Sequence, residues 1–187
     1  MSLIPAFEIG LWNGWIFMLY LILSPLLIRL ILKDAWKKVA TARDMLLNKT
    51  EKKLATAISL LFYALFIYSI FLPLKLGTAC FYAGFFIFLL GLIFNITAMV
   101  NFATTPLDKP VTKGVYRVSR NPMYLGMFLI FTGTGIACVS WIFLLSTIGS
   151  IILTRIFVIS EERFCLKKYG DAYREYMNRT PRWISFM

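Results

Sequence analysis

The chain alternates between long apolar runs and short basic segments. The apolar runs cover Ile9–Leu32, Leu54–Leu74, Gly77–Phe102 and Pro122–Ser160. A helix needs about 20 mostly apolar residues to cross the hydrocarbon core of a bilayer, so each of the first three runs predicts one membrane span. The last run has 39 residues and predicts two spans, joined by a turn near 138–141. The pattern therefore predicts an all-α fold, a polytopic transmembrane helical bundle of about five spans.

The segments between these runs predict three kinds of connection. Residues 33–53 mix basic and apolar side chains, which favours a short amphipathic helix on the membrane surface. A turn at 73–77 contains Pro and Gly, and it predicts an antiparallel hairpin of the second and third spans. Residues 103–121 are polar and also contain Pro and Gly, which indicates an ordered loop. From Glu161 the chain is charged with a helical pattern, which predicts a C-terminal helix outside the membrane.

The distribution of basic residues predicts the orientation in the membrane. Of the 20 Lys and Arg residues, 17 lie in segments 33–53, 103–121 and 161–187. Five spans place these three segments on one side of the bilayer, and the positive-inside rule assigns that side to the cytosol. We expect a multi-pass protein with a cytosolic C-terminus. We divide it into 1–102, which holds three spans and the basic connector, and 103–187, which holds the loop, a transmembrane hairpin and the C-terminal helix.

Composition narrows the chemistry that is available. The chain is 59% hydrophobic with a mean hydropathy of +0.74, more apolar surface than one soluble core can bury. Its net charge of +11 lies in loops between apolar runs, which favours contact with anionic lipid and predicts no nucleic-acid partner. Histidine is absent and the three cysteines are widely spaced, so we expect no metal site. The sequence leaves the oligomeric state open.

The segment from Gly114 to Gly126 has more polar residues than a simple connection requires. Asn121 followed by Pro122 is typical of a helix start, in which the Asn side chain accepts a hydrogen bond from a free backbone N–H group. That explanation does not cover the nearby arginines and tyrosines. Backbone N–H groups beside arginine side chains can hold a carboxylate or a phosphate. The segment therefore predicts an anion site, to which we assign Tyr116, Arg117, Arg120 and Tyr124.

A second group of charged residues lies where the last apolar run ends. Arg155 and Glu162 are seven residues apart and share one helix face, while Glu161 points elsewhere. An arginine within a membrane span is a functional candidate, and Glu162 is its expected partner. The alternative is that Arg155 extends to the interface and both glutamates are solvated. Asn95 lies within the third span, where a polar side chain more often joins helices than lines a pocket.

Three tyrosines near the C-terminus have helical spacing. Tyr169, Tyr173 and Tyr176 share one face, which could cover an aromatic ligand, although packing explains each of them equally well.

The last 75 residues carry these motifs in an order that resembles a known family. The centre Arg-Asn-Pro-Met-Tyr-x-Gly is followed by a span, Glu-Glu-Arg, Tyr-Gly, further tyrosines and Pro-Arg. This resembles the integral membrane methyltransferases that include isoprenylcysteine carboxyl methyltransferase and the phospholipid (phosphatidylethanolamine) N-methyltransferases. Many members carry His where this chain has Asn121, so a role that needs imidazole is excluded here.

The resemblance implies a cofactor, S-adenosylmethionine, bound at the cytosolic boundary of the membrane. It implies cofactor-binding residues at Gly114, Tyr116, Arg117, Arg120, Asn121, Pro122, Tyr124, Gly126, Glu161 and Glu162. We also assign catalytic roles to Glu162, Arg155 and Glu161.

The acceptor that the resemblance implies is a hydrophobic or lipid molecule from the bilayer. We favour a phospholipid headgroup amine over the carboxylate of a prenylated cysteine or a small thiol. A non-catalytic transporter or assembly protein is the alternative from another class.

Overall fold

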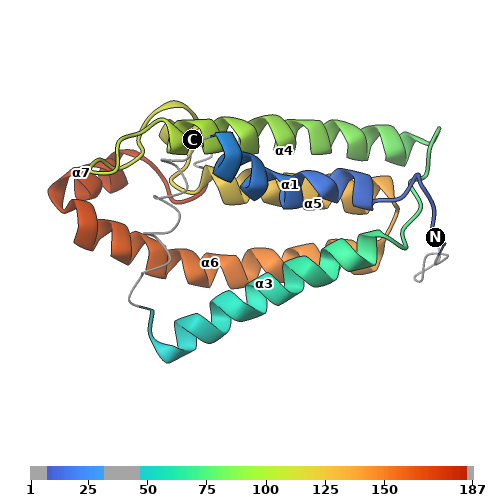
Figure 1. Cartoon of the computed structure of the whole chain (residues 1–187), viewed down its shortest axis with the longest axis horizontal. Helices are drawn as coiled ribbons and strands as arrows, with labels where there is room; N and C mark the ends of the chain where they lie inside the picture. The colour runs from blue at the N-terminus through green and yellow to red at the C-terminus, as the bar shows by residue number, and fades with distance from the viewer. Residues whose placement is uncertain (1–7, 32–46, 185–187) are drawn as a thin grey trace.

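The computed structural model describes residues 8–31 and 47–184, and this part of the chain is helical (Figure 1). The only β-type pairing among the described residues is an isolated bridge between Asn13 and Pro73. The predicted all-α class is therefore confirmed. The helices are α1 (Trp15–Ile31), α3 (Lys49–Ser69), α4 (Ala79–Ala103), the 3₁₀ helix η1 (Gly114–Arg117), α5 (Pro122–Ala137), α6 (Trp141–Tyr169) and α7 (Asp171–Arg179).

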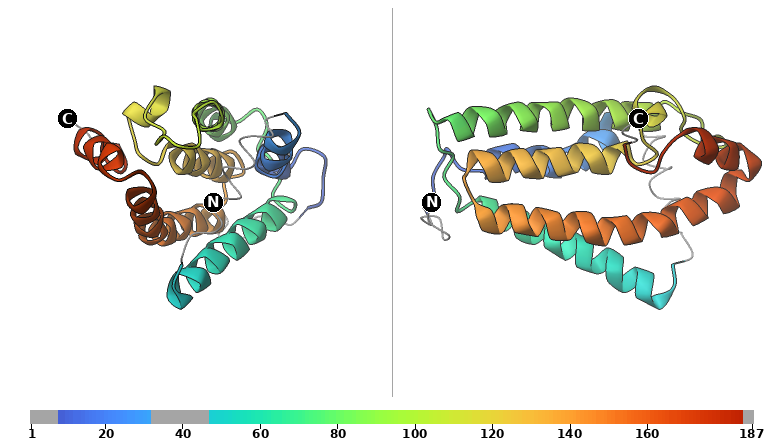
Figure 2. Two further views of the ribbon diagram at one scale, coloured as in Figure 1. Left: turned by 60° about the vertical axis from the view of Figure 1, so that its left-hand side comes forward. Right: turned by 180° about the vertical axis from the view of Figure 1, so that it is seen from behind.

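Helices α1, α4, α5 and α6 run lengthwise through the molecule, and α3 lies at an angle to them, as Figures 1 and 2 show. Of the described helices, α3, α4 and α6 are long and apolar enough to cross a membrane. Helix α1, with 17 residues, and helix α5, with 16, are shorter. A 16-residue helix extends about 24 Å, less than the roughly 30 Å of the hydrocarbon core. The expected multi-pass arrangement is thus confirmed with three full-length spans and two shorter helices.

Helices α4 and α5 pack more closely than any other pair, and glycines allow this. A Cβ atom on Gly84 would lie 2.5 Å from the carbonyl oxygen of Gly133, and one on Gly91 would lie 2.8 Å from that of Gly126. Both helices therefore carry glycines seven residues apart, and these face each other in antiparallel order. Small residues let helix backbones approach in lipid, where hydrophobic association is weak. Gly126 consequently belongs to this contact, against the backbone of Asn95.

Helix α3 departs from the prediction in its partners and in its start. It packs on α6 and α1, so the predicted hairpin of residues 54–74 with 77–102 is wrong as a packed unit. Unlike α4 and α5, α3 contains no glycine for close backbone contact. It begins at Lys49, where Asn48 and Glu51 form a capping box. Residues 49–53 thus extend α3, and residues 32–46 of the expected surface helix lie outside the described residues.

The C-terminal part of the chain folds over one end of the bundle. α6 continues through Glu161 and Glu162 to Tyr169, because neither Pro nor Gly occurs between residues 150 and 169, and it ends at Gly170, which has a φ of +55°. The charged helix predicted from Glu161 is therefore the end of α6 followed by the separate helix α7. Figure 1 shows α7 at the end of the molecule opposite the N-terminus. The two glutamates lie inside α6, about two turns before its end.

Candidate functional site

The chain from η1 to α5 is held in place by the C-terminal tail. The backbone N–H of Arg120 donates to the carbonyl of Pro181 at 3.0 Å. Asn121 precedes α5, and Pro122 occupies the first helical position as predicted. The side chain of Asn121 makes no capping hydrogen bond, contrary to the prediction, and its Nδ2 instead donates to the carbonyl of Arg182 at 3.0 Å. Asn121 therefore fastens the tail to the start of α5.

Glu162 is the centre of a buried ion cluster. Its side chain is 5% exposed, and its Oε2 accepts hydrogen bonds from Arg182 Nε at 3.0 Å and Nη2 at 2.7 Å. Arg120 Nε lies 3.3 Å from Glu162 Oε1. The predicted pair of Glu162 with Arg155 is wrong, because Glu162 pairs instead with Arg120 of the loop and Arg182 of the tail. Arg155 itself is exposed on α6.

Glu161 lies on the same cavity as Glu162 but has different partners. The hydroxyl of Tyr124 on α5 donates to Glu161 Oε1 at 3.0 Å. Among the described residues no arginine or lysine forms an ion pair with Glu161. Glu161 does point in a different direction from Glu162, as expected, although both side chains line one cavity: α6 presents Glu161 to Tyr124 of α5, whereas Glu162 faces the loop and the tail. The two neighbouring carboxylates thus differ, one neutralised by two arginines and one held by a phenol.

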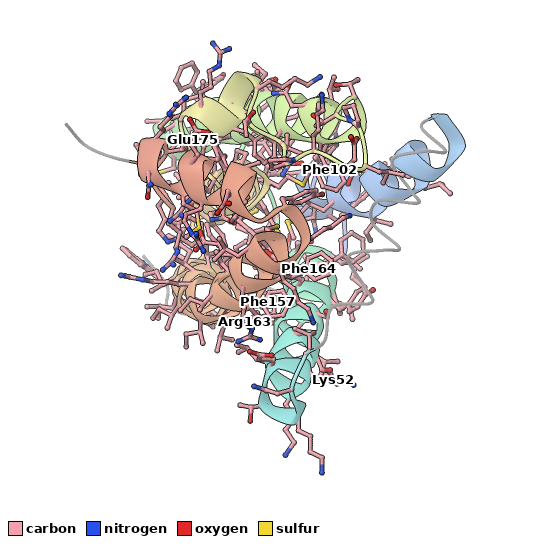
Figure 3. All side chains as sticks on the ribbon, turned by 90° about the vertical axis from the view of Figure 1, so that its left-hand side faces the viewer. Lys52, Phe102, Phe157, Arg163, Phe164 and Glu175 are labelled. Atoms are coloured by element: carbon pink, nitrogen blue, oxygen red, sulfur yellow. The ribbon has the colours of Figure 1, made fainter. Side chains whose placement is uncertain are left out.

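Both carboxylates line a cavity of about 440 Å³ at the end of the bundle. In Figure 3, which faces this end, Phe102 and Phe164 mark the parts of α4 and α6 that border it. Seven of the predicted cofactor-binding residues line the cavity: Tyr116, Arg120, Asn121, Pro122, Tyr124, Glu161 and Glu162. Gly114, Arg117, Gly126 and Arg155 are not among its lining residues. Gly114 instead takes a φ of +59° where a Cβ atom would meet the Asn101 side chain.

The cavity also uses residues that the motifs did not identify. Asn95 and other residues of α4 line it, as do Leu21 and Ser24 of α1. The pocket alternative for Asn95 is thus confirmed, although its Nδ2 also joins helices by donating to the Met123 carbonyl at 2.7 Å. The residues that line the cavity therefore come from both predicted parts of the chain, 1–102 and 103–187. The division into these two parts stays a prediction.

Tyrosines from the end of α6 and from α7 close the cavity. Tyr169, Tyr173 and Tyr176 all line it, and the Tyr176 hydroxyl donates to the Tyr116 carbonyl at 2.7 Å. Only their four- and three-residue spacing pointed to this role in the sequence.

The electrostatics of the rim keep the tyrosines neutral and the tail arginine charged. Burial raises the pKa of Tyr116, Tyr173 and Tyr176 well above the ordinary value, so these phenols stay protonated even where an exposed tyrosine would ionise. The hydrogen bond to Glu162 raises the pKa of Arg182. Within the described part of the chain, no group of three or more Cys, Asp or Glu residues is arranged to hold a metal ion. The cavity thus offers hydrogen bonds, aromatic rings and charges of both signs.

Comparison with known proteins identifies the family of this chain. Residues 74–172 match the phospholipid methyltransferase family. The chain is also similar to the protein-S-isoprenylcysteine O-methyltransferase of Schizosaccharomyces pombe, with 30% identity over 77 residues. That similarity covers 40% of this chain and 32% of the yeast protein, so it spans about a third of the relative's length. The family match includes more than half of the chain, the whole of α4 and α5 and both glutamates of α6, and the protein therefore belongs to the phospholipid methyltransferase family.

Proposed function

We propose that this protein is a membrane methyltransferase that uses S-adenosylmethionine to methylate a lipid-like acceptor, with a phospholipid headgroup amine favoured. One observation carries the proposal. Arg120 Nε and Glu162 Oε1 are buried on the cavity wall, and neither has a hydrogen-bond partner among the described residues. They lie 3.3 Å apart as an ion pair, without a hydrogen bond between them. A cation and an anion thus stand side by side, each with unused hydrogen-bonding capacity.

The amino-acid end of S-adenosylmethionine fits this pair. Its carboxylate suits the Arg120 guanidinium and its ammonium suits the Glu162 carboxylate, because charge-assisted hydrogen bonds are the strongest that such groups form. The tyrosines of η1 and α7 supply aromatic faces for the adenine ring and the sulfonium. A cavity of about 440 Å³ is also within the range of small-molecule sites, roughly 300–1,000 Å³.

Glu161 is the residue that we place at the reacting centre. When bound, S-adenosylmethionine supplies an electrophilic methyl group, so the protein has to position the acceptor and manage its charge. Glu161 has no arginine or lysine partner among the described residues, and Tyr124 fixes one of its oxygens. A carboxylate held in this way can bind a cationic ammonium headgroup or accept the proton that an amine loses. Glu162 then has the separate tasks of binding the cofactor and holding the tail.

Cofactor binding and methyl transfer test these roles separately. We expect titration calorimetry on detergent-purified protein to show S-adenosylmethionine binding. Glu162→Gln should weaken that binding, whereas Glu161→Gln should leave it within about twofold and lower the methylation rate about 100-fold, as loss of a general base does. The control is Glu175→Gln, on the exposed side of α7. Absence of cofactor binding by the wild-type protein would refute the proposal and favour the alternative, a non-catalytic transporter or assembly protein.

The yeast relative favours a second candidate acceptor, the carboxylate of an isoprenylated cysteine. Incubation with methyl-labelled cofactor, total membrane lipids and a farnesylated cysteine separates the two, because a methyl ester is lost in mild base and a methylamine is not. We expect base-stable label in the phospholipid fraction. Label confined to a water-soluble thiol would contradict a lipid acceptor of either kind.

The cavity faces the cytosol in this proposal, because the loop, tail and α3 start carry most of the basic residues. A reporter enzyme that is active only in the cytosol, fused to the C-terminus, should be active. Activity of a reporter that requires export would reverse the orientation.

A further inference from the structure

A second cavity of about 430 Å³ opens on the side of the bundle. Apolar side chains of α4, α5 and α6 line most of it, among them Phe94, Leu129 and Ile151, and Trp183 of the tail closes one end. Among the described residues that line it, Arg155 is the only charged one. The cavity is thus an apolar groove with a single cation.

Arg155 has no hydrogen bond or ion pair with any other described residue, and its side chain is exposed. It lies five residues before Ser160, where the apolar run of α6 ends, a distance of about 7.5 Å along the helix. An arginine side chain is long enough to extend from that depth to the lipid headgroups. An unpaired cation at a groove in the membrane is expensive unless an anion meets it, and the anion at that level is a lipid phosphate.

The groove lies directly behind the wall of the cofactor cavity. The consecutive residues Tyr124 and Leu125 line the cofactor cavity and the groove respectively. In the tail, Arg182 binds Glu162, while the next residue, Trp183, lines the groove with its ring 6.1 Å from that of Phe128. A lipid in the groove would therefore have its headgroup beside Tyr124, which binds Glu161, and beside the tail segment that binds Glu162. Arg155 and Glu161, six residues apart in α6, are about 9 Å apart along its axis.

We propose that this groove binds the phospholipid acceptor, with an acyl chain along α5 and α6 and the phosphate on Arg155. The role of Arg155 is to position the acceptor. Lipid binding in the groove stands by itself, and only its effect on methyl transfer rests on the proposed function. The lipid is held by its phosphate and chain, which leaves the headgroup amine free to reach Glu161. The Arg182–Trp183 segment then separates the groove from the cofactor cavity, and the headgroup has to pass it to reach Glu161.

Lipid binding tests the site without reference to activity. Detergent-purified protein is titrated with a phosphatidylethanolamine that carries a photoreactive acyl chain, and the labelled peptides are mapped. We expect labelling in residues 125–132 and 183–184, and displacement by unlabelled phosphatidylethanolamine but not by diacylglycerol, which lacks the phosphate. Arg155→Gln should weaken binding about tenfold, which corresponds to about 1.4 kcal/mol. Arg155→Lys should retain most of the affinity.

The matched control is Arg163→Gln, which removes the same charge from α6 at a side chain that pairs with Glu51 outside both cavities. It should leave labelling unchanged. Equal labelling of wild type and Arg155→Gln, or equal displacement by diacylglycerol, would overturn the proposal.

The kinetic readout keeps the two proposals separate. Arg155→Gln should raise the KM for phospholipid about tenfold with unchanged cofactor affinity. Loss of labelling at the groove in a protein that still methylates phospholipid with wild-type KM would refute the groove and leave the proposed function standing. Arg155-dependent labelling in a protein that binds no S-adenosylmethionine would refute the proposed function and leave the lipid groove standing.

Discussion

The ion cluster around Glu162 should determine how firmly the tail closes the cofactor cavity. Glu162→Gln keeps the size of the side chain but removes its charge. Arg182 then loses two charge-assisted hydrogen bonds, and Arg120, whose side chain is 9% exposed, loses its nearby anion. Breaking a buried ion pair costs about 3–5 kcal/mol. Gln keeps an oxygen acceptor and Arg182 is 34% exposed, so we expect about 2–3 kcal/mol.

This loss should appear as local opening of the tail. The Arg120 N–H is protected by its hydrogen bond to the Pro181 carbonyl. Since about 1.4 kcal/mol is a factor of ten, we expect amide exchange in peptides covering 117–123 to rise about 30- to 150-fold in Glu162→Gln. Hydrogen–deuterium exchange with mass spectrometry on detergent-purified protein measures this directly.

The control for this experiment is Glu175→Gln. Glu175 pairs with Arg179 within α7, and both side chains are mostly exposed. Exposed pairs contribute little to stability, so this variant loses the same charge at the same end of the molecule with little change in exchange. Unchanged protection of the Arg120 region in Glu162→Gln would refute the role given to the ion cluster.

Two further predictions concern the helices that support the site. Gly133→Ala places a Cβ atom 2.5 Å from the Phe88 backbone nitrogen and should lower the thermal midpoint of unfolding. The control Gly149→Ala, whose Cβ atom has no neighbour within 4 Å, should leave the midpoint unchanged. Equal midpoints for the two variants would contradict close α4–α5 packing. Tyr20→Phe removes the hydroxyl that donates to Asn95 Oδ1 at 3.0 Å and should destabilise the protein by about 0.5–1.5 kcal/mol in denaturant titrations. No change would mean that another donor replaces the hydroxyl.

Local sequence determined the helical class and most helix boundaries. Apolar runs of span length have to form helices in lipid, because no water is present there to satisfy the backbone. Pro122 and the turn after Ala137 were likewise readable, and α5 begins and ends, and α6 begins, where these signals predict. The motif between Gly114 and Gly126 identified the segment that carries Arg120 and Tyr124.

Tertiary structure decided which side chains meet. Spacing along one helix suggested Arg155 as the partner of Glu162, but it gave no information about arginines from the loop and the tail, which approach from outside the helix. Similarly, α3 packs on α6 and not on α4, whose glycines face α5. A one-dimensional pattern determines which residues share a face of a helix. What that face contacts depends on the packing of the whole bundle.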